Sequence, residues 1–228
     1  MSRILITSGP TREYLDPVRY LTNASSGRMG SALALAASDA GHEVVIVSGP
    51  VELEYPAAAE VIRVISTQEM LEACCRVFPE CRGVIAVAAP CDYRPVEVAR
   101  HKLRKTGRGL ELRLEETPDI VATLGRLRKA GQWMVAFALE TEDPRLRAME
   151  KLARKRCDLI VLNGLAAMHS EQTAVEIIDR QGQIVGAFSG DKTKVARQVF
   201  GVIQDRLMRC SEGLQPPGCG DEVGRQVQ

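Results

Sequence analysis

Short apolar runs rich in β-branched residues alternate with longer amphipathic stretches along most of this chain. Such runs indicate buried strands, and apolar residues at helical spacing indicate helices between them. Apolar strands alternating with helices are typical of a parallel sheet covered on both faces, so we predict a doubly wound α/β fold. The predicted strands are Arg3–Thr7, Glu43–Ser48, Val61–Ile65, Gly83–Ala88, Met134–Ala138 and Leu159–Leu162, and the predicted helices are Ser26–Ala40, Thr67–Val77, Pro118–Ala130, Pro144–Lys155 and Lys192–Met208.

Three segments depart from this alternation. Residues 100–116 are basic and then alternate in polarity, which predicts an excursion from the main sheet: a loop followed by a strand or hairpin. Residues 174–188 contain two β-type runs flanking Asp179–Gly182, which predicts a hairpin at the sheet edge. Residues 209–228 are polar and rich in Gly and Pro, so we predict a folded domain over 1–208 and a disordered tail over 209–228.

Composition excludes several classes of protein. The 228 residues carry a net charge of only +1, which disfavours non-specific binding to nucleic acid or to a membrane surface. No apolar run approaches the roughly 20 residues of a membrane span and no signal peptide is evident, so we expect a cytoplasmic protein. The seven cysteines lack Cys-x-x-Cys spacing and the three histidines lie far apart, so neither a disulfide framework nor a zinc site is indicated.

The first strand leads into a loop that closes with the sequence NASSGRMG, residues 23–30, before an Ala/Leu-rich helix. A strand, a turn of small residues and a helix N-terminus together form a cradle for an anion, because glycine allows close approach and the first helical amides are free. The loop therefore predicts a nucleotide or a phosphorylated metabolite as ligand. The spacing Gly27-x-x-Gly30 alone is equally compatible with tight packing of the helix on the sheet.

Two further clusters are candidates for chemistry. Asp92 follows a strand and a small-residue turn, where ligands of parallel sheets lie, and a basic cluster follows it from Arg100 to Arg108. Such a loop could close over a polyphosphate, or it could be an ordinary solvated surface loop. Lys151 and Lys155 are four residues apart and share one helix face, which is also common on exposed helices.

Five blocks in order resemble the phosphopantothenate–cysteine ligase family, which in many bacteria forms the C-terminal half of a bifunctional flavoprotein of coenzyme A synthesis. The resemblance covers residues 3–208. The blocks are SGPTREYLDPVRYLTNASSGRMG, VSGPV, AAPCDYRP followed by KLRK, TPDIV, and VAFALET followed by the two lysines and DLIVLN.

The resemblance implies a Rossmann-like sheet and a ligase reaction in two steps. The carboxylate of 4′-phosphopantothenate attacks the α-phosphate of CTP, pyrophosphate leaves, and the amine of L-cysteine attacks the acyl-nucleotide. ATP is the alternative nucleotide. The resemblance also implies that Mg²⁺ arrives with the nucleotide and that two copies form a homodimer joined by the strand–loop excursion. Because no decarboxylase half is present, we expect no flavin, and the Met1 start favours a separate gene over an excised domain.

The resemblance also assigns roles to residues. Asn23 contacts the acyl carbonyl and assists the cysteine step, and Lys102 contacts the triphosphate from a loop that closes on substrate. Phe137 could stack on the base. Ala88, Ala89 and Asp92 border the intermediate as well as the nucleotide. The positions assigned to nucleotide binding are Ser25, Gly27, Gly30, Ala86, Val87, Ala88, Asp92, Lys102, Pro118, Asp119, Ile120, Val121, Phe137, Lys151 and Lys155.

The chain departs from the family pattern at Pro90 and Cys91, which stand where Val and Ala are common, at Arg104 in KLRK, and at Thr117, where Asn is frequent. Pro90 lacks a backbone donor, and Cys91 has no activating histidine in its sequence neighbourhood. Two alternatives stay open. A non-catalytic nucleotide-binding protein is favoured only by this altered turn, and a nicotinamide-dependent reductase is disfavoured because Tyr-x-x-x-Lys is absent and no acidic residue ends the second strand.

Overall fold

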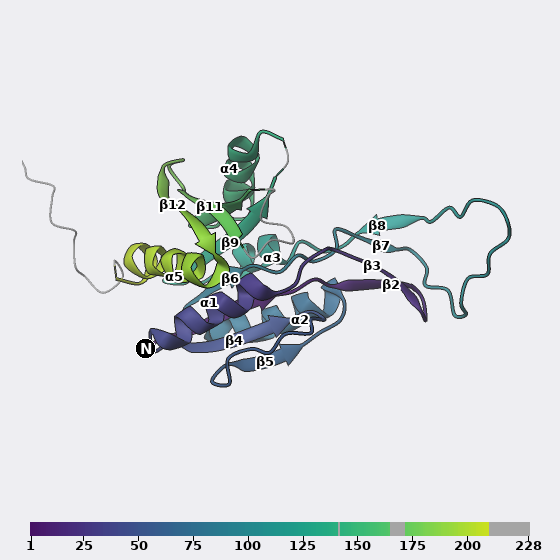
Figure 1. Ribbon diagram of the computed structural model, residues 1–228, viewed down its shortest axis with the longest axis horizontal. Helices are drawn as coiled ribbons and strands as arrows, with labels where there is room; N and C mark the ends of the chain where they lie inside the picture. The colour runs from purple at the N-terminus through teal and green to yellow at the C-terminus, as the bar shows by residue number, and fades with distance from the viewer. Residues whose placement is uncertain (141, 165–171, 210–228) are drawn as a thin grey trace, which may run out of the picture.

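An eight-stranded sheet forms the centre of the molecule in this computed structural model, which describes residues 1–140, 142–164 and 172–209 (Figure 1). The strand order is β12-β11-β10-β9-β6-β1-β4-β5, and all neighbours are parallel except the last two strands in sequence, which add antiparallel at one edge. The strands are β1 (Arg3–Ser8), β4 (Glu43–Ser48), β5 (Glu60–Arg63), β6 (Gly83–Ala86), β9 (Trp133–Leu139), β10 (Leu159–Asn163), β11 (Gln172–Asp179) and β12 (Ile184–Asp191).

Helices cover both faces of this sheet. α1 (Arg28–Asp39) and α5 (Lys192–Ile203) pack on one face, where Leu33 and Val199 are fully buried. The other face packs against α2 (Thr67–Val77), α3 (Ile120–Leu127) and α4 (Pro144–Arg154). Short helical segments follow two of these helices: the 3₁₀ turn Phe78–Glu80 after α2 and the π-helical turn Gln204–Met208 after α5. The doubly wound fold predicted from the apolar pattern is confirmed.

Four short strands build an arm that projects from the body of the molecule (Figure 1). β2 (Arg12–Asp16) and β3 (Arg19–Thr22) form one hairpin, and β7 (Tyr93–Pro95) pairs antiparallel with β8 (Leu114–Glu116). The loop 96–113 connects β7 to β8 at the far end. The predicted excursion over residues 100–116 is thus confirmed as a loop that leads into a strand, but its partner strand lies upstream of it.

Buried Asp16 fixes this arm. Its carboxylate accepts hydrogen bonds from the amides of Val18 and Arg19 and from the amide of Leu103 on the opposite hairpin, and it pairs with the Arg19 guanidinium at 2.7 Å. Burial opposes ionisation, but these donors and the adjacent cation hold the pKa of Asp16 below its ordinary value. An ionised carboxylate therefore ties the long loop to the β2–β3 turn.

Several predicted bounds need correction. The strand predicted over Gly83–Ala88 ends at Ala86, and the helix predicted over Pro118–Ala130 spans only Ile120–Leu127, because Asp119 caps its start and Arg128 leaves the helical conformation at ψ 128°. The hairpin predicted around Asp179–Gly182 is confirmed as β11–β12. The predicted disordered tail, apart from Arg209, lies outside the described residues. Within the described part of the chain, no helix is both long and apolar enough to span a membrane.

Candidate active site

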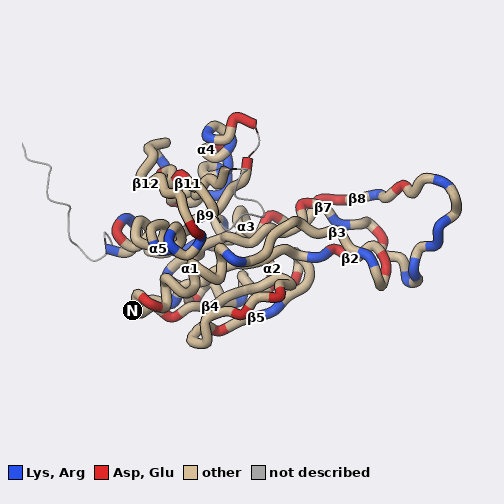
Figure 2. Tube along the Cα trace, in the orientation of Figure 1, with Lys and Arg blue, Asp and Glu red and all other residues tan. Residues whose placement is uncertain are grey.

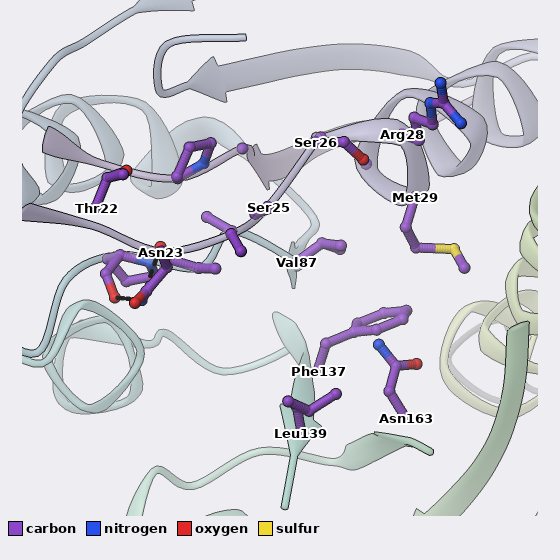
Figure 3. A pocket seen from close by; sticks show the side chains of 18 of the residues that line it. Thr22, Asn23, Ser25, Ser26, Arg28, Met29, Val87, Phe137, Leu139 and Asn163 are labelled. Atoms are coloured by element: carbon purple, nitrogen blue, oxygen red, sulfur yellow. Dashed lines mark hydrogen bonds between the residues drawn. The ribbon is translucent and has the colours of Figure 1, made fainter. Parts of the chain in front are cut away.

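A cavity of about 900 Å³ lies at the carboxyl edge of the parallel strands, where ligands of doubly wound sheets bind (Figure 3). Its walls are the loop between β3 and α1, the turn after β6, the ends of β9 and β10, and the first residues of β11 and α5. This volume is at the upper end of the range for small-molecule sites, and it can accommodate a nucleotide together with part of a second substrate.

The N-terminus of α1 faces the cavity with its first amides free of side-chain caps. Gly27 takes a left-handed conformation at φ 73° and its carbonyl accepts from the Ser8 hydroxyl at 3.2 Å. A Cβ at Gly30 would lie 2.2 Å from the Ser8 oxygen, so only glycine allows the helix to start this close to β1. Uncapped amides at the positive end of a helix dipole have the geometry that anion binding requires, and the anionic ligand stays a prediction. The tight packing of the helix on the sheet, which was the alternative interpretation of the spacing Gly27-x-x-Gly30, is present as well.

Asn23 lies at the opposite end of this loop, against the turn after β6. Its Nδ2 donates to the carbonyls of Pro90 at 2.9 Å and Ala89 at 3.3 Å (Figure 3). The amide is therefore held at the cavity wall, beside the segment that also carries Asp92. Asn23 and Asp92, which are distant in the sequence, are brought to one wall as the resemblance implied.

Buried hydroxyls hold the turn that Asn23 contacts. The Thr11 hydroxyl accepts from the Cys91 amide at 2.8 Å, and the Thr117 hydroxyl donates to the Cys91 carbonyl at 2.5 Å. The Thr117 amide donates in turn to the Asp92 carbonyl at 2.9 Å. Thr117, one of the departures from the family pattern, thus binds this turn to the segment preceding α3.

Cys91 is a structural thiol in this arrangement. Its Sγ is buried and lies 3.5 Å from the carbonyls of Thr11 and Leu21. Burial raises the pKa of the Cys91 thiol, which disfavours the thiolate that a nucleophile requires. The amides on both sides of Pro90 are bonded within the protein, Ala89 to the Gly9 carbonyl and Cys91 to Thr11. The backbone N–H groups of the two residues beside Pro90 therefore both donate to groups within the protein.

The predicted lysines of α4 are paired with carboxylates. Lys155 Nζ lies 3.1 Å from the Asp119 carboxylate, which also caps α3 by accepting from the Ala122 amide at 3.0 Å. Although burial raises it, the pKa of Asp119 lies below its ordinary value because of that amide and the Lys155 ammonium. Lys151 pairs with Glu140, which follows β9, and its side chain also lines the cavity.

The cavity brings together many of the predicted site residues, and it leaves others out. Phe137 projects its ring into the cavity between Val87 and Asn163 (Figure 3). The predicted residues that line the cavity are Asn23, Ser25, Gly27, Gly30, Val87, Ala88, Ala89, Asp92, Phe137 and Lys151. The predicted residues that do not line it are Ala86, Lys102, Pro118, Asp119, Ile120, Val121 and Lys155.

Lys102 is exposed on the loop 96–113. Figure 2 shows Lys and Arg residues gathered at the end of the arm that this loop forms. The adjacent Leu103 is anchored to the β2–β3 hairpin, since its amide donates to Asp16 and its carbonyl accepts from Arg19 at 3.0 Å. The structure therefore places Lys102 away from the cavity. For Lys102 to contact a triphosphate, the loop 96–113 must move toward the cavity.

Several cavity residues were not among the sequence-based candidates. Four of them come from the first residue of α1, the end of β10, the start of β11 and the first residue of α5: Arg28, Asn163, Thr173 and Lys192. Asn163 could have been found, because it directly ends a predicted strand. Thr173 and Lys192 carry no signal of their own, since they reach the cavity only through the antiparallel addition of β11 and β12.

Fold and site together define a class: a doubly wound α/β domain whose glycine-rich loop and uncapped helix open onto a cavity at the carboxyl edge. Residues 1–207 match the family described as DNA/pantothenate metabolism flavoprotein C-terminal domain, and the chain belongs to this family.

Individual relatives and a solved structure are similar to most of the chain. A Vibrio cholerae protein, coenzyme A biosynthesis bifunctional protein CoaBC, is 43% identical over 187 residues, covering 79% of this chain and 47% of that protein. A protein named cysteine/cysteine sulfinic acid decarboxylase, from an unidentified prokaryote, is 43% identical over 188 residues, covering 80% of this chain and 52% of that protein. The chain thus spans about half the length of these curated relatives. A crystal structure of the C-terminal domain of CoaBC superposes with a TM-score of 0.78 at 38% identity, covering 91% of this chain and 96% of that domain.

Proposed function

We propose that this chain is a ligase of coenzyme A biosynthesis that joins 4′-phosphopantothenate to L-cysteine through an acyl-nucleotide. The observation that carries the proposal is the single cavity wall on which Asn23 and Asp92 lie, next to the uncapped N-terminus of α1. The similarity to the C-terminal domain of CoaBC, which covers nearly all of that domain, supports it.

The proposed reaction has two steps. The substrate carboxylate forms a bond to the α-phosphorus, the bond to the β-phosphate oxygen breaks, and pyrophosphate leaves with the electron pair. The cysteine amine then attacks the acyl carbon, loses its proton, and displaces the nucleoside monophosphate. The protein's contribution is to orient two anions, stabilise the charge on the leaving group and exclude water.

In this proposal the uncapped amides of α1 bind phosphate, Phe137 lies beside the base, and Asn23 contacts the acyl carbonyl. We propose CTP as the preferred nucleotide, with Mg²⁺ carried by its phosphates. Among the described residues, Asp92 is the carboxylate that lines the cavity.

The proposal is tested by measuring pyrophosphate release with 4′-phosphopantothenate, L-cysteine, Mg²⁺ and either CTP or ATP. We expect release that depends on 4′-phosphopantothenate, a product that gains the mass of cysteine, and faster turnover with CTP. Folded protein that binds a nucleotide but releases no pyrophosphate with either one would instead establish the non-catalytic alternative.

We also propose that the arm joins two copies of the chain. Apolar side chains are exposed along it, including Tyr93 at 50% and Val98 at 56%. Exposed apolar residues on a projecting element are typical of an interaction surface, and a second copy offers the same surface.

Val98→Glu is expected to weaken this dimer by roughly tenfold or more, because the interface would bury an unpaired charge. Sedimentation velocity over a dilution series measures the dissociation. Leu146→Glu is the matched control, since Leu146 on α4 is similarly exposed, at 62%, but lies away from the arm. Equal dissociation of the two variants would rule out the arm as the interface.

A further inference from the structure

The part of the long arm loop that contains Lys102 is bonded to the β2–β3 hairpin on both sides of that residue. The Ala99 amide donates to a carbonyl of β2 at 3.0 Å, and the Leu103 amide donates to Asp16 Oδ2 at 3.0 Å. Ala99 and Leu103 are half-buried, whereas the three residues between them are exposed. Residues 99–103, which we call the clamped segment, are therefore held at both ends by one hairpin.

The two carboxylate oxygens of Asp16 have different partners. Oδ1 accepts from the amides of Val18 and Arg19 at 2.8 and 3.0 Å, which closes the turn of the hairpin itself. Oδ2 accepts from the Leu103 amide and, at 2.7 Å, from the Arg19 guanidinium. The same guanidinium donates to the Leu103 carbonyl at 3.0 Å. Oδ2 and Arg19 together therefore bond both backbone groups of Leu103.

The turn alone does not explain a buried carboxylate at this position. The neutral side chain of Asn closes such a turn as well as that of Asp does, because one oxygen is enough to accept from the following amides. Asp16 is fully buried, and burying a charge is costly unless it is paired and hydrogen-bonded. The second oxygen and the charge are used for the contact with Arg19 and with the clamped segment.

The other end of the same hairpin lies at the cavity (Figure 1). Tyr20 and Thr22 of β3 line the cavity, and Asn23 follows β3 directly. The Thr22 hydroxyl donates to the Thr11 carbonyl at 2.7 Å, which fixes the two strands to each other at this end. One hairpin therefore connects the cavity wall at its base with the clamped segment at its turn.

We propose that Asp16 is a positioning residue for Lys102 in the first step of the reaction; this rests on the proposed ligase function. While the clamped segment stays bonded to the hairpin, Lys102 approaches a bound triphosphate only by a movement that the hairpin shares. Asp16 touches no reacting atom in this scheme. Its effect is to restrict the positions open to the ammonium, and such preorganisation raises the rate of a step that the cation assists.

Asp16→Asn tests the proposal because it changes one of the two oxygens. The amide oxygen of the new side chain can still accept at the turn, whereas its NH₂ group would face the Leu103 amide, and two donors cannot bond. We expect acyl-nucleotide formation in a single turnover to slow by roughly tenfold, with CTP affinity unchanged by calorimetry. Glu115→Gln is the matched control: it makes the same acid-to-amide change in the arm, at an exposed ion pair with Arg94, and should keep the wild-type rate.

A double-mutant cycle distinguishes positioning of Lys102 from a general effect on the fold. If Asp16 acts through Lys102, the variant that combines Asp16→Asn with Lys102→Gln should form the acyl-nucleotide at the rate of Lys102→Gln alone. Two losses that multiply in the double variant would overturn the inference. An undiminished first step in folded Asp16→Asn would overturn it as well, and the ligase proposal would stand in either case.

Amide hydrogen exchange makes the failure of this inference distinguishable from the failure of the proposed function, because it needs no turnover. The Leu103 amide should exchange faster in Asp16→Asn than in the wild-type protein or in Glu115→Gln. If the wild-type protein forms no product, the ligase proposal fails, and faster exchange still supports the contact of Asp16 with the clamped segment. Unchanged exchange of the Leu103 amide would show that Asp16 does not hold this segment, whatever the activity.

Discussion

Asn23→Asp is expected to accumulate the acyl-nucleotide, because the first step continues while its reaction with cysteine slows by about 100-fold or more. The amide of Asn23 is a neutral donor whose Nδ2 bonds the carbonyls of Pro90 at 2.9 Å and Ala89 at 3.3 Å. Contact with the acyl oxygen would replace the longer of these two bonds. A carboxylate cannot donate to these carbonyls, and it would oppose the negative charge that develops on the acyl oxygen. Removing one such donor from a preorganised site costs roughly 10²–10³ in rate.

Quenched-flow experiments with labelled CTP would measure the two steps of Asn23→Asp separately. The first step, followed as pyrophosphate release in a single turnover, serves as the internal control for folding and nucleotide binding. Asn23→Gln is a useful companion, since it keeps the donor but displaces it by one methylene. Full turnover of the acyl-nucleotide by Asn23→Asp would discard the role assigned to Asn23.

The central sheet could be predicted because its strands are buried on both faces. β4, for example, reads EVVIVS and has five consecutive buried residues, a pattern that few other structures produce. The arm was harder to predict. β2 and β3 mix polar and half-buried residues, as in REYLD and RYLT, and β7 and β8 each span only three residues. β7 and β8 pair only across the long loop 96–113, and that loop is tied to the β2–β3 hairpin through Asp16, so little local signal is left in the sequence.

The candidate site likewise contains residues that could be predicted from the local sequence and residues that could not. Asn23, Gly27 and Gly30 could be predicted because a strand, a glycine-rich turn and a helix N-terminus follow one another within a short segment. Thr173 and Lys192 could not, because they reach the cavity only through strands that add antiparallel at the sheet edge. Local sequence therefore predicts the glycine-rich loop and helix N-terminus, whereas the part of the cavity wall formed by Thr173 and Lys192 depends on topology.

Lys102→Gln is expected to slow acyl-nucleotide formation by roughly a hundredfold, and the position of Lys102 indicates which step and which constant should change. Lys102 is exposed on the loop 96–113 and does not line the cavity, so its contribution depends on approach of the loop to the triphosphate. A cation that arrives with the closing loop would stabilise charge on the leaving pyrophosphate only once the nucleotide is bound. The loss should therefore fall on the rate of the first step more than on nucleotide affinity.

Single-turnover pyrophosphate release, together with calorimetric CTP binding, would separate these two effects for Lys102→Gln. Arg108→Gln removes one positive charge from the same exposed loop outside the KLRK motif and is the matched control for a general electrostatic effect. If both variants lose rate equally, the loop acts through its net charge and Lys102 has no individual role. If Lys102→Gln forms the acyl-nucleotide at the wild-type rate, Lys102 has no role in the first step. The function of this part of the loop is then the anchoring of Leu103 to Asp16 and Arg19. The charge on the leaving group would in that case be stabilised by residues of the cavity alone.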